Sequence, residues 1–161
     1  MKFKIGDRVV HCTYGLGQIL AIEERTINEI TCPYYMVKVA DLTIWIPIDE
    51  NLKSRLRQPN DAAGFKESIS VLSEPAESLP SDYRQRNLQL HDMLKDGEVE
   101  SYCKVIRDLS AYSQGRVSSD HDNVLMKHVQ GILIGEWSFS LAITLDAAKL
   151  ELNRLITSVV V

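Results

Sequence analysis

The side chains of this chain that could carry nucleophilic, acid–base or metal chemistry are few and far apart in the sequence. Its three cysteines, Cys12, Cys32 and Cys103, are an odd number without close Cys or His partners, which argues against a disulfide framework and a structural zinc site. His11 stands beside Cys12, but neighbouring side chains on a strand point to opposite faces, so the two cannot easily act together. The other histidines are scattered and suggest no catalytic set: His91, His121 and His128.

Phosphate chemistry also lacks its usual signals in this sequence. Neither a glycine-rich phosphate loop nor a paired ligand motif occurs, and both are common marks of nucleotide-using or metal-using enzymes. We therefore expect a protein that is not an enzyme and that uses neither a metal ion nor another cofactor.

Trp45 is the side chain whose position most suggests binding. It alternates with Ile44 and Ile46, so the two isoleucines are expected to face inward and the tryptophan outward. An outward tryptophan is costly unless something covers it, and tryptophan is common among binding hot spots. We favour contact with a partner over the alternative, in which the helical part of the chain packs on it.

The first third of the chain has the pattern of a small antiparallel sheet. Strands are expected at 8–11, 18–24, 34–40 and 43–46, with a short fifth strand near 55–57, because apolar and polar residues alternate there with a period of two. The glycine pair Gly15 and Gly17 marks a tight turn, and Asp41-Leu42 a hairpin connection. Five short strands predict a closed or nearly closed Tudor/SH3-like barrel over residues 1–59.

After Pro59-Asn60-Asp61 the apolar spacing becomes helical, beginning with a helix over 62–72. Pro75 and Pro80 place a loop over 73–81. Further helices are expected at about 82–95, 98–112, 118 or 119 to 140, and 144–158, with Ser119 and Thr144 as caps. Gly131 and Gly135, four residues apart, suggest close approach of another helix. The sequence thus predicts an α+β protein whose residues 60–161 form an all-α domain of about five helices.

Size and charge limit the possible partners. The chain has 161 residues and a net charge of −4. Residues 1–59 contain 8 basic (Lys and Arg) and 7 acidic (Asp and Glu) residues, residues 60–76 contain 1 and 3, and residues 77–161 contain 9 and 12. None of these three parts is basic enough to hold duplex DNA through many phosphate contacts. No apolar run approaches the roughly 18 residues of a membrane helix, and no signal-peptide core is visible. We expect a cytoplasmic protein without a membrane partner.

A series of short motifs resembles the CarD-type RNA-polymerase-binding regulators, whose N-terminal module is shared with the polymerase-interaction domain of the transcription-repair coupling factor. In the first 48 residues these motifs are Ile5-Gly6-Asp7-x-Val9-Val10, Tyr14-Gly15-x-Gly17-x-Ile19, Ile22-Glu23-x-Arg25-x-Ile27, Tyr34-Tyr35 and Ile46-Pro47-Ile48. Beyond them come Leu79-Pro80-x-x-Tyr83-x-x-Arg86, Val105-Ile106-Arg107-Asp108-Leu109 and Ile132-Leu133-Ile134-Gly135-Glu136. The resemblance covers nearly the whole chain.

For the barrel, the resemblance implies binding to the β subunit of bacterial RNA polymerase, with Arg25, Trp45, Ile46 and Pro47 as the expected contact residues. A barrel can bind by adding its exposed strand edge to a sheet of the partner. Arg25 lies at a position that resembles a polymerase contact, where it would meet an acidic group; the alternative is a solvated arginine. Trp45 departs from the pattern, because many relatives carry a basic residue there.

For the helical domain, the resemblance implies contact with promoter DNA through Tyr83, Arg84, Arg86 and Arg107. Relatives usually have a tryptophan at the place of Tyr83, which wedges into the minor groove at the upstream edge of melted DNA while nearby arginines contact phosphate. A tyrosine offers less area, so a weaker effect is expected. From the residues alone, Tyr83 would be the first core residue of its helix, with Arg84 and Arg86 solvated. A mutual ion pair of Arg107 and Asp108 is not expected, because adjacent helical residues do not face one another.

The function expected from these residues is that of a regulator, monomeric alone, that stabilises the promoter open complex. Its contact with DNA would be weak, independent of sequence and made within the polymerase complex. The alternative is an adaptor that binds RNA polymerase and whose helical domain recruits another protein instead of DNA.

Overall fold

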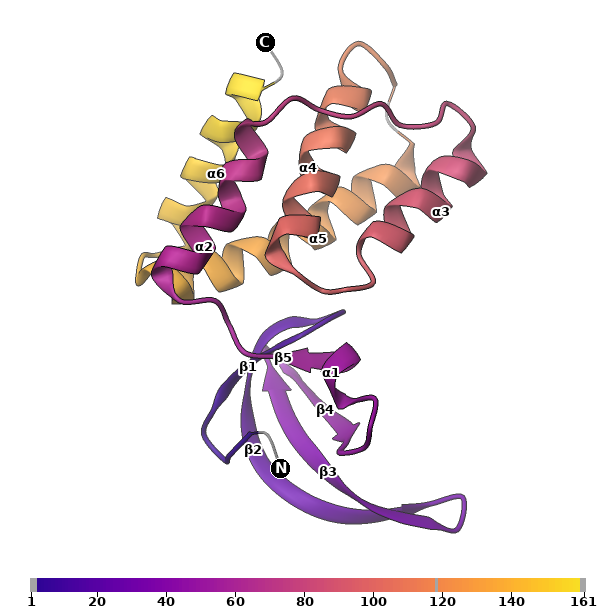
Figure 1. Ribbon diagram of the computed structural model, residues 1–161, viewed down its shortest axis with the longest axis vertical. Helices are drawn as coiled ribbons and strands as arrows, with labels where there is room; N and C mark the ends of the chain where they lie inside the picture. The colour runs from indigo at the N-terminus through magenta and orange to yellow at the C-terminus, as the bar shows by residue number, and fades with distance from the viewer. Residues whose placement is uncertain (1–2, 118, 160–161) are drawn as a thin grey trace. The chain divides into compact units, whose positions relative to one another are not determined.

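A computed structural model of the chain describes residues 3–117 and 119–159. It divides into two compact units, residues 1–59 and residues 60–161, the first built from strands and the second from helices (Figure 1). The expected α+β class is confirmed.

The first unit is a five-stranded antiparallel sheet with the strand order β4-β3-β2-β1-β5. Its strands are β1 (Arg8–His11), β2 (Gly15–Ile27), β3 (Ile30–Val39), β4 (Leu42–Pro47) and β5 (Leu56–Arg57), and a short helix α1 (Leu52–Arg55), which the sequence did not predict, precedes β5. The hydrogen-bonded ladder does not close, because β4 and β5 lie at its two edges.

The inner face of this sheet is apolar, as the alternation predicts. Val37 and Val39 are buried while Lys38 between them is exposed. The phenol of Tyr35 is also buried, but its hydroxyl donates to the Phe3 carbonyl at 3.0 Å and accepts from the Phe3 N–H at 2.9 Å. Burial therefore leaves this polar group satisfied. The buried side chains are Phe3, Val9, Ile19, Tyr35, Val37, Val39, Ile46, Leu52 and Leu56.

Glycine is required in the turn at Gly15 and Gly17 because β2 passes close to β3 there. A Cβ on Gly17 would lie 2.6 Å from Val39 Cγ2 and 2.7 Å from the Lys38 carbonyl oxygen. Gly15 has a φ of 89°, a left-handed conformation that other residues adopt only with strain. The turn thus specifies how β2 passes the end of β3.

The hairpin of β2 and β3 is longer than the sequence predicted and extends past the other strands (Figure 1). Asn28 and Glu29 at its tip both have positive φ, 53° and 66°, as a two-residue hairpin turn requires. The facing residues Ile27 and Ile30 are 48% and 69% exposed. The tip therefore presents an uncovered apolar pair.

The described residues of the second unit form five α-helices: α2 (Ala62–Ile69), α3 (Tyr83–Met93), α4 (Val99–Ser113), α5 (Asp120–Leu141) and α6 (Leu145–Val159). The first expected helix is shorter than predicted and continues as a 3-10 turn, η1 (Ser70–Ser73). The predicted caps are present: Ser119 Oγ accepts from the Asp122 N–H and Thr144 Oγ1 from the Ala147 N–H, both at 3.1 Å. Ser118, the other expected start of α5, lies outside the described residues.

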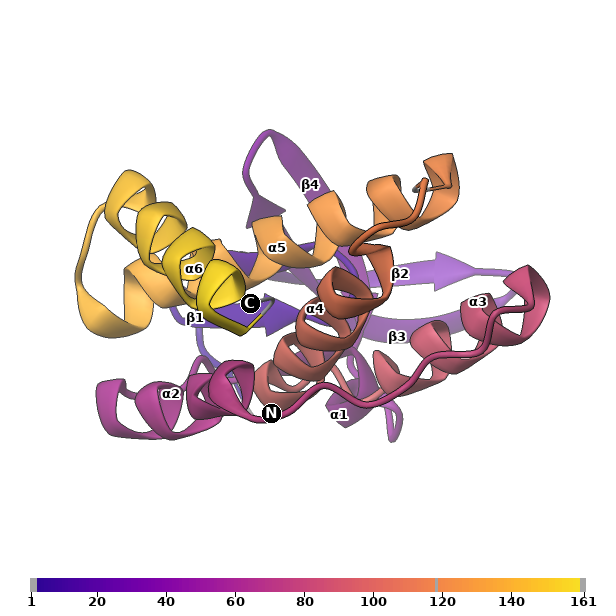
Figure 2. The same ribbon diagram turned by 90° about the horizontal axis from the view of Figure 1, so that it is seen from above.

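The helical core forms around α4 and α5, with Trp137 fully buried against Phe65 at a ring-centroid distance of 5.6 Å. Between η1 and α3 the chain runs extended beside α4 (Figure 1 and Figure 2). The expected close helix approach at Gly131 and Gly135 is wrong, because a Cβ on either, apart from the adjoining backbone of its own helix, meets no heavy atom within 4 Å. In the described part of the chain no single helix is long and apolar enough to cross a membrane; α5 and α6 pass that test only together, bent by 117°.

Candidate functional site

Arg25 and Trp45 form one composite surface on the outer face of the sheet. They stand on β2 and β4, on either side of β3, where Arg25 pairs with Cys32 and Trp45 with Met36. Their side chains reach across β3, so that Arg25 Cζ lies 3.6 Å from the centroid of the Trp45 ring. A guanidinium stacked on an indole is held by a cation–π interaction and keeps its N–H donors available at its edge.

Ile46 and Pro47 have different environments, although they are adjacent. Ile46 is only 2% exposed and belongs to the core of the sheet, so its side chain is not available to a partner and we withdraw it as a side-chain contact. Pro47 is half-buried and pairs with Tyr34 on the outer face.

The outer edge of β4 carries backbone N–H and C=O groups that are not hydrogen-bonded to another strand of the described chain. Ile48 donates its N–H to the Pro33 carbonyl at 2.9 Å, and hydrogen bonds alternate along an antiparallel pair. The N–H and C=O of Trp45 therefore point away from β3, toward the open edge.

Tyr83 is the first residue of α3 and its side chain is 47% exposed. The helix begins cleanly because the Asp82 carboxylate accepts from the Gln85 N–H at 3.1 Å. The Tyr83 ring meets the His121 ring edge to face, with centroids 5.9 Å apart and planes at 80°. Arg86 Cζ lies 5.9 Å from the centroid of the same ring. Tyr83 is thus an exposed but supported aromatic side chain.

The two arginines that follow Tyr83 have opposite roles. Arg84 is exposed, whereas Arg86 is 5% exposed and pairs with the buried Asp122, with Nε and Nη2 at 3.1 and 3.0 Å from Oδ2. Arg86 also donates to the carbonyls of Pro80 and Ser81. Because these contacts occupy its guanidinium inside the helical unit, we withdraw Arg86 as a phosphate contact.

Arg107 is also buried, at 4% exposure, and is withdrawn for the same reason. Its Nε donates to the neighbouring Asp108 carboxylate at 2.8 Å, so the expectation that the two would not pair is wrong: the long side chain bends back along the helix. Asp108 in turn accepts from the Glu77 N–H at 3.0 Å, and Arg107 Nη1 lies 3.5 Å from Glu74. Both residues fasten the extended segment 74–80 to α4.

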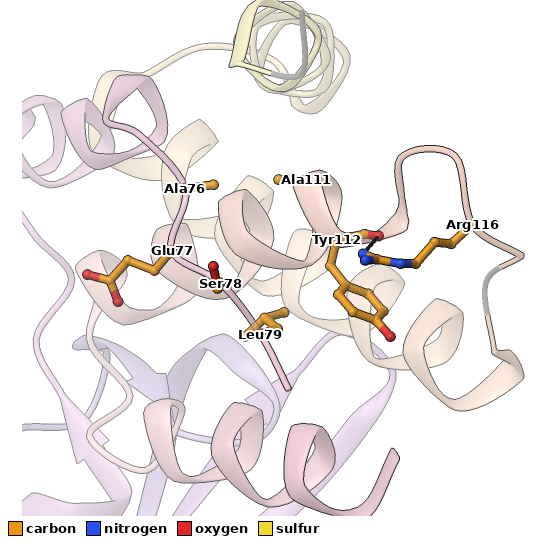
Figure 3. Close-up of a pocket in the computed structure, with 7 residues that line it drawn as sticks. All are labelled: Ala76, Glu77, Ser78, Leu79, Ala111, Tyr112 and Arg116. Atoms are coloured by element: carbon orange, nitrogen blue, oxygen red, sulfur yellow. Dashed lines mark hydrogen bonds between the residues drawn. The ribbon is translucent and has the colours of Figure 1, made fainter. Parts of the chain in front are cut away.

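Sequence reasoning missed Tyr112 and Arg116, which lie near the end of α4. Arg116 Cζ is 4.2 Å from the Tyr112 ring centroid, and Arg86 Cζ lies 4.5 Å from the same ring. Tyr112 and Arg116 border a pocket of about 300 Å³ between α4 and the extended segment (Figure 3). Its other lining residues are Ala76, Glu77, Ser78, Leu79 and Ala111. No periodicity or motif marks them, because their proximity depends on the path of a loop.

His11 and Cys103 have structural environments. His11 Nδ1 accepts from the N–H groups of Thr13 and Tyr14 at 3.0 and 3.2 Å, and burial, with Arg55 nearby, lowers the pKa of His11. Burial raises the pKa of Cys103 to about 12, so this thiol stays protonated at neutral pH. Among the described residues there is no group of three or more His, Cys, Asp or Glu side chains that could hold a metal ion.

Both units match known protein families. Residues 3–58 match the family described as the CarD-like/TRCF RID domain, and residues 67–153 match the CarD C-terminal domain. The chain is also 26% identical over 136 residues to YdeB of Bacillus subtilis (strain 168), a candidate transcription factor. That alignment covers 83% of this chain and 89% of YdeB.

Proposed function

This chain belongs to the CarD family of transcription regulators, and on that premise we propose that it binds the β subunit of bacterial RNA polymerase through residues 1–59 and stabilises the promoter open complex through residues 60–161. The helical unit contacts DNA at the upstream edge of the melted region, weakly and without reading its sequence. The protein, on this premise, performs no catalytic step and acts in the cytoplasm, where bacterial promoters are.

Two features of the sheet support the polymerase contact. The Arg25–Trp45 stack offers a cation and a large apolar surface together, which suits an acidic group next to an apolar one on the partner. Beside it, the outward N–H and C=O of Trp45 lie on an edge strand, which suits addition of a strand of the partner. Pro47 on the same edge has no N–H and so limits how far the pairing can run.

The observation that carries the DNA contact is the exposed Tyr83 ring at the start of α3. An aromatic ring inserted beside a distorted base step compensates for lost stacking and so favours opened DNA. The adjacent Arg84 is exposed and suited to phosphate. Since Arg86 is buried, it acts by supporting the helix start.

Tethering explains how an acidic unit can act on DNA. In residues 60–161, Lys and Arg number 10 against 15 Asp and Glu, so free duplex binding is expected to be weak. Attachment to polymerase makes the DNA contact intramolecular and raises its effective concentration to the millimolar range for short linkers.

The test is the lifetime of open complexes after challenge with a competitor. Tyr83→Ala should leave polymerase affinity unchanged and shorten the lifetime, because the ring is lost without disturbing the core. Leu88→Ala is the matched control, since Leu88 lies on the same helix and is 72% exposed. Unchanged lifetimes for Tyr83→Ala on several promoters would reject the DNA contact.

A second candidate is the adaptor, in which the helical unit recruits a protein. Exposed apolar side chains on α3 and α5 favour it: Leu88 is 72% and Val124 69% exposed. Site-specific crosslinking from position 83 in promoter complexes separates the two functions. A crosslink to upstream DNA supports the first, and a crosslink only to protein supports the adaptor.

A further inference from the structure

His121 is the neighbour that the exposed Tyr83 ring has on another helix, and nothing in the sequence pattern singles it out. It is the second residue of α5, whose N-terminus is fixed by the Ser119 cap. Its ring faces the Tyr83 ring at 5.9 Å with the planes at 80°. Edge-to-face geometry at this distance is an attractive arrangement for two aromatic rings.

From these contacts we infer that His121 is a positioning residue, which holds the Tyr83 side chain in the outward orientation needed for contact with opened DNA. This inference rests on the proposed function of Tyr83. A tyrosine at the first position of a helix has no preceding turn to restrict its rotamers, so the support must come from elsewhere in the fold.

The position of His121 is itself fixed by a buried ion pair. The next residue, Asp122, is 4% exposed and bonded to Arg86, which stands one turn after Tyr83 on α3. This pair joins the start of α5 to the start of α3. The Tyr83 ring is close to both sides of that junction: its centroid lies 5.9 Å from the His121 ring, which neighbours Asp122, and 5.9 Å from Arg86 Cζ.

His121 acts through the shape of its ring. Its Nε2 is buried and has no hydrogen-bond partner among the described residues, so that atom contributes no bond to the arrangement. The ring of His91 supports His121 at a centroid distance of 5.7 Å. A phenylalanine at position 121 should therefore keep the contact with Tyr83, whereas an alanine removes it.

The experiment uses the full chain and follows the aromatic ¹³C–¹H signals of tyrosine by NMR, with the Tyr83 signals assigned from their loss in Tyr83→Phe. In His121→Ala the Tyr83 signals should shift and sharpen as the ring gains mobility, and in His121→Phe they should keep linewidths close to those of the wild type. His128→Ala, an exposed histidine of the same helix, is the matched control. Circular dichroism and thermal unfolding show whether each variant is folded.

Open-complex lifetime provides the second readout. An aromatic pair contributes about two- to tenfold in an equilibrium constant, so His121→Ala should shorten the lifetime by about that factor, without exceeding the effect of Tyr83→Ala. When Tyr83 is already replaced by alanine, His121→Ala should cause no further shortening of the lifetime. When Tyr83 is present, His121→Phe should give a lifetime close to that of the wild type.

Unchanged Tyr83 signals in His121→Ala, or equal losses in His121→Ala and His121→Phe, would overturn the inference. If Tyr83→Ala itself left lifetimes unchanged, the proposed DNA contact would fall, while a response of the ring signals to His121→Ala alone would still establish the positioning role.

Discussion

Arg84 and Arg86 stand two positions apart in one helix, yet only one of them can meet a partner. We expect Arg86→Ala to lower the free energy of unfolding by about 3–5 kcal/mol, because it leaves the Asp122 carboxylate buried without its cation. Arg84→Ala should change stability by less than about 0.5 kcal/mol and should reduce the salt dependence of the DNA contact. Urea denaturation measures the first effect. If Arg86→Ala lowered the free energy of unfolding by much less than this, the Asp122 carboxylate would have to be bound by another side chain or by water.

The Arg25–Trp45 stack makes a second prediction at this scale. Single substitutions Arg25→Ala and Trp45→Ala should each weaken polymerase binding, and a double-mutant cycle should reveal a coupling of about 0.5–1 kcal/mol in the stability of the unit, typical of an exposed cation–π pair. Denaturation of the four proteins gives the stability cycle. Strict additivity would show that the 3.6 Å stacking contributes nothing in solution.

At the scale of elements, the two glycines of α5 should be replaceable with a gain in stability. Apart from the adjoining backbone of α5, no heavy atom lies within 4 Å of a Cβ built on Gly131 or Gly135, and alanine is better than glycine in a helix by up to about 1 kcal/mol. Each Gly→Ala change should raise the melting temperature, by at most about 4–8 °C in a unit of this size. Gly17→Ala is the contrasting variant and should be destabilising, since its Cβ would overlap Val39 and the Lys38 carbonyl.

The elements also show how far sequence reasoning reaches. Alternation and spacing identified every strand and the five helices, and β1 was predicted at its observed bounds, because one buried face fixes a period. The extension of β2 and β3 escaped prediction because Ile27 and Ile30 pack against no core, so no period of burial continues there. The four-residue α1 is too short to establish a helical period.

Only some residues of the candidate site could be predicted from the sequence. Arg25, Trp45 and Tyr83 could be selected, since their residue types and the family resemblance indicate exposed contacts. The burial of Arg86 and Arg107 depends on Asp122 and on the extended segment 74–80, which are tertiary contacts without a local pattern. His121 was missed for the same reason, because its partner Tyr83 is 38 positions away on another helix.

For the whole molecule, the proposed function requires that the polymerase-binding unit, residues 1–59, stay covalently connected to the helical unit that carries Tyr83. Arg25→Glu leaves Tyr83 intact but replaces the cation of the proposed polymerase-binding surface with an anion. We expect the variant to lose its effect on open complexes over the concentration range in which the wild type saturates, because the acidic helical unit cannot find DNA without the tether. Co-purification with polymerase checks the binding, and lifetimes of open complexes check the effect. Full activity with binding lost would refute tethering.

The same mechanism predicts that the sign of the regulation depends on the promoter. A ring that stabilises opened DNA lowers the free energy of the open complex by a similar amount everywhere, since it reads no base edge. Where the open complex collapses quickly, more of it survives to initiate, and transcript yield should rise. Where the open complex is already stable, the same stabilisation adds to the barrier that polymerase must cross to leave, and escape should slow. Measured on a series of promoters, the ratio of transcript yields with wild-type and Tyr83→Ala protein should therefore fall as the intrinsic open-complex lifetime increases. A ratio independent of that lifetime would show that the helical unit acts at another step.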